Sequence, residues 1–206
     1  MIAALFVDPN GCYANIEGVD LWDENRDARK YTGPWPVVAH PPCARWGRYW
    51  FGGPSAKVRR IKGDDGGCFA SAIASVRRFG GVIEHPEASA AWLAHGLMEP
   101  PRFGGWVSSG MIDGGWTCCV EQGHYGHRAR KPTWLYAVRA DPPALRWGKS
   151  AAEGKAIDAG YHSAAERAAA RAAGTLAGGG RLGKRARAAT PPEFRDVLIA
   201  MARSVK

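Results

Sequence analysis

The sequence predicts an α/β fold: a Rossmann-like, mostly parallel sheet with flanking helices, followed by a basic helical C-terminal extension. From residue 1 to about residue 140, short apolar runs alternate with helix-competent segments, which is typical of a sheet covered on both faces. Hydrophobic residues make up 46% of the 206 residues, enough to bury a sizeable core. The composition then shifts to Ala, Gly and Arg. We therefore expect one α/β domain over residues 1–140 and an extension over residues 141–206.

The predicted strands are short, and most end at residues that stop a strand. Residues 2–7 form an apolar run closed by the turn Asp8-Pro9-Asn10-Gly11, and Pro41-Pro42 ends a second run over residues 36–40. Further strands are expected over residues 16–22, 82–84, 116–121 and 133–138. Ligands of parallel sheets bind outside the carboxyl ends of the strands, so the residues that follow these runs are candidates for a site.

Helices are expected between the strands and beyond them. The spacing over residues 69–79 places Ile73 and Val76 on one face, and Gly80-Gly81 ends that helix. Residues 23–31, 88–97 and 151–173 are also helix-competent. Residues 174–190 are interpreted as a mobile basic linker.

The last predicted helix begins near Thr190 and ends near Ser204. Thr190 is the expected N-cap, with Pro191 in the first turn and Glu193 three residues on. One apolar face is shared by Phe194, Val197, Leu198 and Met201. We expect this face to dock on the sheet.

The chain carries a formal net charge of +9 and has a pI of about 9.6. Because its cations are clustered, we expect a polyanionic partner, DNA above all; the alternative is a basic surface that only promotes solubility. No stretch approaches the ~18 apolar residues that span a bilayer, and residues 1–7 lack the basic leader of a signal peptide. We therefore expect no membrane partner and a cytoplasmic location, in the host cell if the chain is phage-encoded. The five cysteines are then expected to be free thiols.

The segment His40-Pro41-Pro42-Cys43 is the strongest candidate for chemistry. Two prolines directly after a predicted strand turn the chain out of the sheet and present the Cys43 thiol rigidly at the strand end. With Arg45 and Arg48 nearby, we expect a lowered thiol pKa and a nucleophilic thiolate. The alternative is a buried cysteine beside a turn.

Two later segments also carry candidate residues. Glu84 ends a predicted strand, where its carboxyl group can protonate or hydrogen-bond a ring nitrogen; the alternative is an acid at the start of the next helix. Residues 122–133 form a loop rich in Gly, His and cations. Such a loop suits phosphate contact, and a solvated hairpin loop is the alternative.

Arginines and aromatic residues interleave after the Cys43 turn, as Arg45, Trp46, Arg48, Tyr49, Trp50 and Phe51. This pattern is able to stack an extruded base and hold its backbone, whereas the alternative is packing in the core.

No metal is expected. Cys118-Cys119 with His124 and His127 supplies zinc-type ligands, but adjacent cysteines on a strand point to opposite faces of the sheet. The sequence also has no P-loop and no Gly-x-Gly-x-x-Gly motif.

These elements, in this order, resemble the cytosine-C5 DNA methyltransferases, especially small phage-borne relatives. Pro42-Cys43 matches the family's Pro-Cys turn, whose thiolate attacks C6 of a flipped cytosine. Glu84 matches the glutamate that contacts N3 of the base. Gln122, Tyr125-Gly126, Arg128 and Arg130 resemble a later segment whose arginine holds the base. The resemblance therefore implies that the catalytic residues are Cys43, Glu84, Arg128 and Arg130.

The resemblance also implies S-adenosylmethionine as the cofactor. The family's Phe-x-Gly-x-Gly-Gly loop is replaced here by Phe6-Val7-Asp8-Pro9-Asn10-Gly11. The expected cofactor-binding residues are the acidic and turn residues Asp8, Asn10, Gly11, Asp20 and Asp23. The expected contacts to DNA or to the flipped base are His40, Pro42, Arg45, Trp46, Arg48, Gln122, Tyr125, His127, Lys131, Arg181, Lys184, Arg185 and Arg187. Target recognition is left to residues 141–187 or to a protein partner.

Three functions follow from these observations. The first is a compact DNA cytosine-C5 methyltransferase. The second is an enzyme of the same ancestry that uses Cys43 and Glu84 for other base or nucleotide chemistry, without S-adenosylmethionine. The third is a non-catalytic DNA-binding protein that hinders restriction enzymes.

Overall fold

The computed structural model describes residues 1–52, 57–110, 113–152 and 184–206, together with the isolated residues 165, 168, 169, 172 and 182. Its strands are β1 (Ile2–Leu5), β2 (Val19–Trp22), β3 (Val37–Ala39), β4 (Gly81–Pro86), β5 (Val107–Ser108), β6 (Trp116–Glu121) and β7 (Pro132–Val138). Its helices are α1 (Cys68–Phe79), α2 (Ala90–Ala94), α4 (Lys184–Ala188) and α5 (Pro192–Arg203), with the 3-10 helices η1 (Ala28–Lys30) and η2 (Gln122–Tyr125). No helix of these residues is long and apolar enough to cross a membrane.

The strands form one mixed sheet in the order β2-β1-β3-β4-β7-β6-β5. Strands β2, β1, β3 and β4 are parallel, whereas β7, β6 and β5 continue the sheet in antiparallel pairs. The expectation of a mostly parallel sheet therefore holds for one half only. The reason is the connection between β6 and β7, which is too short for a crossover and brings the chain back beside the strand it has just left.

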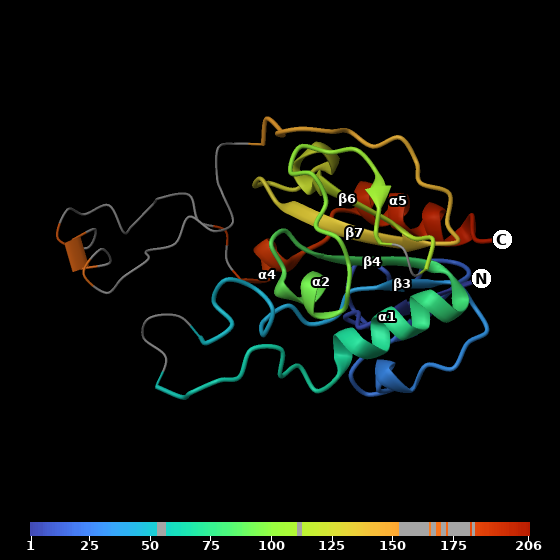
Figure 1. Cartoon of the computed structure of the whole chain (residues 1–206), viewed down its shortest axis with the longest axis horizontal. Coiled ribbons are helices and arrows are strands. Elements are labelled where there is room, and N and C mark those ends of the chain that lie inside the picture. The colour runs from blue at the N-terminus through green and yellow to red at the C-terminus, as the bar shows by residue number, and fades with distance from the viewer. Residues whose placement is uncertain are drawn as a thin grey trace.

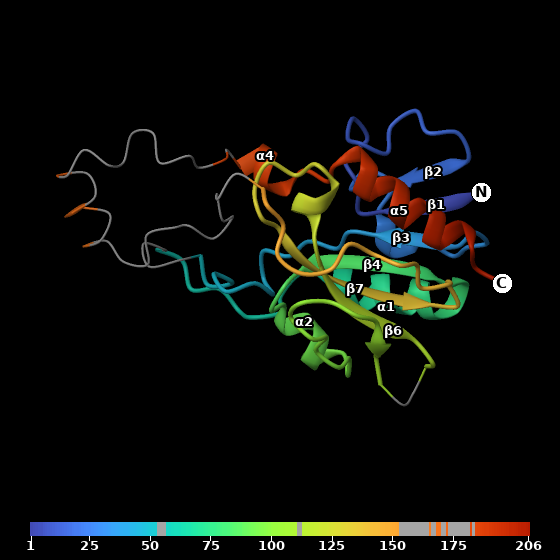
Figure 2. The same ribbon diagram turned by 90° about the horizontal axis from the view of Figure 1, so that it is seen from above.

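Helix α1 covers one face of the sheet and helix α5 covers the other (Figure 1, Figure 2). Alternate strand residues point to the two faces, so each strand contributes to two apolar layers. Leu5, Ala39 and Ile83 pack with the α1 layer. Ala4, Val38, Val82 and the face of α5 that carries Phe194, Leu198 and Met201 form the other layer. The predicted docking of the C-terminal helix on the sheet is confirmed.

The parallel half has a change of direction in its winding. The chain passes from β1 outward to β2, then returns to β3 on the opposite side of β1. The connections that leave β1 and β3 therefore diverge at the carboxyl ends of these strands, which is where open α/β sheets bind ligands.

The helix expected over residues 23–31 is wrong, since only η1 forms there. Asp27 adopts a left-handed backbone conformation with φ of 53°, which an α-helix interior does not accommodate. Its carboxylate instead accepts a hydrogen bond from the backbone N–H of Arg29. The segment lacks the apolar stripe that would have held a longer helix on the sheet.

The C-terminal extension also differs from expectation. The last helix starts at Pro192, with Pro191 rather than Thr190 as its N-cap and no capping side chain. Lys184–Ala188, expected as linker, form helix α4. The helix expected over residues 151–173 and the rest of the linker over residues 174–190 lie largely outside the described residues.

Candidate active site

Cys43 lies just beyond the carboxyl end of β3. Pro41 is buried, Pro42 and Cys43 are exposed, and the backbone N–H groups of Trp46 and Gly47 each donate to the Cys43 carbonyl over 3.0 Å. This turn fixes the backbone that carries the thiol. The structure therefore presents Cys43 at the strand end, as the two prolines predict.

A buried hydrogen-bond chain joins the ends of β3 and β4. Nδ1 of His40 lies 3.0 Å from Oε2 of Glu84, and Nε2 lies 2.8 Å from the hydroxyl of Tyr13. Burial raises the pKa of Tyr13 well above its usual value, so this phenol keeps its proton. A neutral His40 then accepts from Tyr13 at Nε2 and donates to Glu84 through Nδ1–H.

Gln122 continues the chain from the other side of Glu84. Its Nε2 donates to Oε1 of Glu84 over 2.9 Å and to the hydroxyl of Thr133 over 3.0 Å. Both amide hydrogens are thereby used, while the buried Oε1 of Gln122 has no donor among the described residues. Glu84 is thus held by a histidine and an amide, and each carboxylate oxygen keeps a lone pair for a further donor.

Glu84 is ionised over the physiological pH range. Burial alone would raise its pKa, but the hydrogen bond from His40 and the positive charge of Lys131 lower it to about 2. The carboxylate is therefore a hydrogen-bond acceptor. The expectation that Glu84 protonates a ring nitrogen is corrected: it instead favours a ring nitrogen that already carries a proton.

The pKa of the Cys43 thiol moves in the direction opposite to the one expected. Although the residue as a whole is exposed, desolvation of its thiol by the surrounding atoms and the negative charge of Glu84 raise this pKa, while Lys131 lowers it. Arg45 and Arg48 supply no compensation, because Arg45 donates to the carbonyl of Trp50 and Arg48 lies over the ring of Tyr49. The cation that lowers the pKa of Cys43 is therefore Lys131, the last residue of the loop between β6 and β7.

The predicted site residues of that loop differ in their contacts and in their exposure. Arg130 forms a two-point ion pair with the buried carboxylate of Glu121, at 3.0 Å and 2.5 Å from Oε1, and so points away from an incoming base. Arg128 is exposed. Tyr125 is buried against Phe194 and its hydroxyl accepts from the N–H of Arg146. Only Arg128 of these side chains is free to reach a base or a phosphate in this conformation.

His127 and Lys131, expected as DNA contacts, are buried against α4. Nε2 of His127 lies 3.2 Å from the carbonyl oxygen of Ala186. The ammonium group of Lys131 donates to the carbonyls of Ala188 and Ala189, over 3.2 Å and 3.0 Å. These side chains bind the chain's own C-terminal segment.

Trp46 is likewise a core residue. It is 8% exposed, packs against Phe69 and donates from Nε1 to Asp65 over 2.7 Å. Its expected role as a stacking surface is therefore wrong in this conformation. Tyr49 and Phe51 are each 37% exposed.

The expected cofactor residues do not fit S-adenosylmethionine. The carboxylate of Asp20 is already bound by Nε1–H of Trp22 over 2.8 Å and by Arg26 over 2.6 Å. The guanidinium of Arg26 also lies over the ring of Trp22, 4.0 Å from its centroid. The backbone N–H of Arg26 donates to the carboxylate of Asp23.

At the exit of β1, Asp8 accepts from the N–H of Asn10 and its carbonyl accepts from Gly11, in a closed turn. The carboxylates of Asp8 and Asp20 are thus already engaged by donors within the chain.

The remaining predicted DNA contacts lie in the C-terminal segment, and the structure describes only some of them. Arg185 and Arg187 are exposed on α4, and Lys184 is its first residue. Arg181 lies outside the described residues. Cys118 packs in the α5 layer and Cys119 in the α1 layer, on opposite faces as their adjacency predicts.

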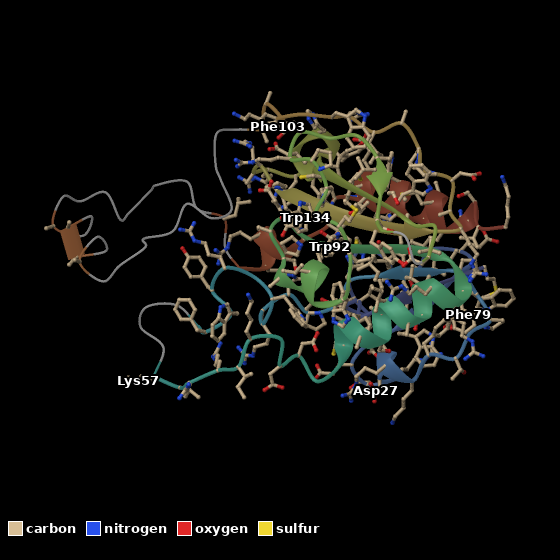
Figure 3. The ribbon with its side chains drawn as sticks, in the orientation of Figure 1. Asp27, Lys57, Phe79, Trp92, Phe103 and Trp134 are labelled. Atoms are coloured by element: carbon tan, nitrogen blue, oxygen red, sulfur yellow. The ribbon has the colours of Figure 1, made fainter. Side chains whose placement is uncertain are left out.

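Two features were missed from the sequence. Tyr13 was not recognised, because a lone tyrosine in the loop after β1 carries no pattern. The second feature is a run of exposed cations before α1, consisting of Lys57, Arg59, Arg60 and Lys62. Its charge density was a usable signal. Figure 3 places Lys57 well away from the sheet, on a segment that extends from the end where Cys43 lies.

Comparison of the chain with models of protein families, with curated proteins and with solved structures gives no match.

Proposed function

We propose that this chain is a DNA base-modifying enzyme of the cytosine-C5 methyltransferase type, built on a Rossmann-like sheet, with Cys43 as the nucleophile. The observation that carries the proposal is the pairing of Cys43 with an ionised, buried Glu84 at the ends of adjacent parallel strands. Ala39 on β3 is in register with Ile83 on β4, so the residues that follow share one edge of the sheet. The net charge of +9 suits a DNA substrate.

The chemistry follows from the two side chains. A flipped cytosine that approaches Glu84 takes up a proton at N3, because the carboxylate stabilises the resulting N3–H by a charge-assisted hydrogen bond. This proton withdraws electrons from C6. The Cys43 thiol gives up its proton, which passes through water to supply the proton taken up at N3, its sulfur forms a bond to C6, and the electron pair of the C5–C6 double bond moves toward C5.

The resulting C5 is nucleophilic. In the simplest reaction it takes a proton from water, loses one of its two hydrogens, and expels the Cys43 thiolate as the double bond re-forms. The net result is exchange of the C5 hydrogen with solvent. In a modification reaction, an alkyl group from a donor replaces the entering proton. Because the Asp20 carboxylate, expected to bind S-adenosylmethionine, is already bound by Trp22 and Arg26, no donor is assigned to residues of this chain.

Nucleoside mass spectrometry of DNA from cells that express the chain tests the proposal. A modified pyrimidine is expected with the intact chain and is expected to be absent with Cys43→Ser. The matched control is Cys68→Ser, which removes a half-buried thiol at the start of α1. Unmodified DNA with the intact chain, or equal modification with Cys43→Ser, contradicts the proposal.

A second function is favoured by the raised pKa of Cys43 and by the ion pair that already engages the Asp20 carboxylate. It is DNA binding without catalysis, in which the fold occludes sites from other enzymes. In this case, DNA binding persists in Cys43→Ser and no modified base forms with the intact chain.

A further inference from the structure

Lys131 is a buried cation whose partners are backbone carbonyls. Its side chain belongs to a residue that is 9% exposed, and its ammonium group donates to the carbonyl oxygens of Ala188 and Ala189. Carbonyls at the end of a helix lack partners within that helix, so a cation stabilises them. Lys131 therefore fastens the end of α4 to the loop between β6 and β7.

His127 makes a second contact between this loop and α4. It is 5% exposed, and its Nε2 lies 3.2 Å from the carbonyl oxygen of Ala186. Figure 1 shows α4 at the end of the sheet where the parallel strands finish, and Figure 2 shows it on the side of the sheet where α5 lies. The C-terminal segment is thus docked at the same end of the sheet as Cys43.

The backbone of Lys131 is tied to Glu84 through hydrogen bonds. The carbonyl of Lys131 accepts from the N–H of Gln122 over 3.0 Å and from the hydroxyl of Thr133 over 3.1 Å. Gln122 in turn donates to both Thr133 and Glu84. The position of the ammonium group relative to Glu84 is therefore fixed at two points, by this network and by α4.

We propose that α4 is a positioning element of the active site: the carbonyls at its C-terminal end hold the Lys131 ammonium group in place, and this cation increases the reactivity of the Cys43 thiol. The assignment rests on the proposed function only in treating Cys43 as the reacting group. Lys131 acts through Cys43 and Glu84 and is a positioning residue. Its expected role as a DNA contact is replaced by this one.

The electrostatic surroundings support the proposal. The charged groups that act on the Cys43 thiol are Glu84 from β4, which raises its pKa, and Lys131 at the start of β7, which lowers it. Those that act on Glu84 are Lys131, His40 and His85, and all three lower its pKa. Loss of Lys131 therefore raises the pKa of Cys43, while a carboxylate whose pKa is about 2 stays ionised at neutral pH.

The first experiment measures whether α4 holds Lys131. Lysines of the full chain are labelled with an acylating reagent, and the rate at each site is followed by peptide mass spectrometry. Lys131 is expected to label far more slowly than the exposed Lys206. Ala189→Pro removes the N–H that donates to the Arg185 carbonyl over 3.0 Å, so it is expected to speed the labelling of Lys131. Ala189→Ser keeps this N–H and serves as the matched control.

The second experiment measures whether Lys131 acts on Cys43. The alkylation rate of each cysteine is followed against pH in the intact chain, in Lys131→Met and in Lys131→Arg. Lys131→Met is expected to move the profile of Cys43 to higher pH and to slow its alkylation about threefold at pH values below the pKa. Lys131→Arg is expected to restore the profile. Cys68, whose pKa is affected chiefly by burial, Asp65 and Arg29, is the internal reference for general unfolding.

Two results overturn the proposal. One is labelling of Lys131 as fast as Lys206 in the intact chain, or equally slow in Ala189→Pro and Ala189→Ser. The other is a Cys43 profile in Lys131→Met that matches the intact chain, or that moves together with Cys68. Neither readout uses DNA. A chain that passes both tests but leaves DNA unmodified contradicts the proposed function and leaves the role of α4 intact.

Discussion

The imidazole of His40 lies 3.0 Å from the carboxylate of Glu84, and this contact joins the ends of two parallel strands that are 44 residues apart in the chain. It places a fixed negative charge next to the thiol that leaves β3. This charge raises the pKa of Cys43 and so disfavours the thiolate. The same charge favours a base that is protonated at N3 and therefore more open to attack. The two effects are separable by mutation.

Glu84→Gln is expected to make Cys43 more reactive and the enzyme inactive. Removing the anion lowers the pKa of the thiol, so alkylation of Cys43 is faster at neutral pH. A neutral amide no longer stabilises a proton at N3, so base modification is lost. Thiol alkylation and nucleoside mass spectrometry measure the two effects. The matched control is Glu87→Gln, which removes a carboxylate that contacts Cys119 and Arg102. Slower alkylation of Cys43 in Glu84→Gln contradicts the account.

Ionised Glu84 is expected to stabilise the fold above pH 4.5. Its pKa is about 2 in the folded chain and 4.5 ordinarily, so the stabilisation is complete above 4.5 and is lost as the pH falls toward 2. The difference corresponds to at most about 3 kcal/mol. Urea unfolding between pH 5.5 and pH 2 measures it. Glu84→Gln is expected to flatten this part of the profile, and an unchanged slope in the variant refutes the expectation.

His85 is expected to change the free energy of unfolding over a second pH range, above the one in which Glu84 acts. Burial between the rings of Phe69 and Trp92 lowers its pKa to about 4, against an ordinary value of 6.5. The unfolded chain therefore takes up a proton that the folded chain refuses, and stability falls as the pH drops from 6.5 to 4, by at most about 3 kcal/mol. His85→Phe keeps an aromatic ring in this place and is expected to remove the loss. Equal pH profiles of the unfolding free energy for the two proteins would speak against a buried neutral imidazole.

The exposed cations before α1 are expected to contribute to DNA affinity. Each phosphate contact adds about 0.9 to the slope of log K against log salt on duplex DNA. The double variant Arg59→Gln with Arg60→Gln is therefore expected to make this negative slope shallower by about 1.8, if both side chains contact phosphate. Lys30→Gln with Lys206→Gln removes the same charge from side chains paired with Asp27 and Asp141, and is expected to leave the slope unchanged. Equal slopes for the two double variants would exclude a phosphate contact at Arg59 and Arg60.

Local sequence signals account for the parts of the fold that were predicted. The bounds of β6 match the prediction, because its apolar run has clear ends, and α1 ends at the glycine pair that predicts its end. The short connection between β6 and β7 is a local signal for their antiparallel pairing. The pairing of β7 with β4 joins residues far apart in the chain, so no local pattern indicated it. The helix expected over residues 23–31 failed because a polar segment without an apolar face gains nothing from packing on a sheet.

The candidate site was predicted in the same uneven way. Cys43 follows β3, whereas Glu84 lies within β4, which continues to Pro86. The register of two adjacent parallel strands is enough to bring the end of β3 beside Glu84. Tyr13 and Lys131 obtain their roles from the fold of the loop after β1 and from the docking of α4. Neither depends on a local pattern, which is why a lysine in a basic loop was interpreted as a DNA contact.

The most direct test of the account is exchange of the C5 hydrogen of cytosine in DNA, because this reaction requires the thiol and no donor. A pool of random-sequence duplexes carrying tritium at C5 of cytosine is incubated with the intact chain, and tritium released to water is counted. The account predicts release by the intact chain and by Cys68→Ser, and no release by Cys43→Ser. Release by Cys43→Ser equal to that of the intact chain, or none by the intact chain while it binds the same DNA, would contradict nucleophilic attack by Cys43.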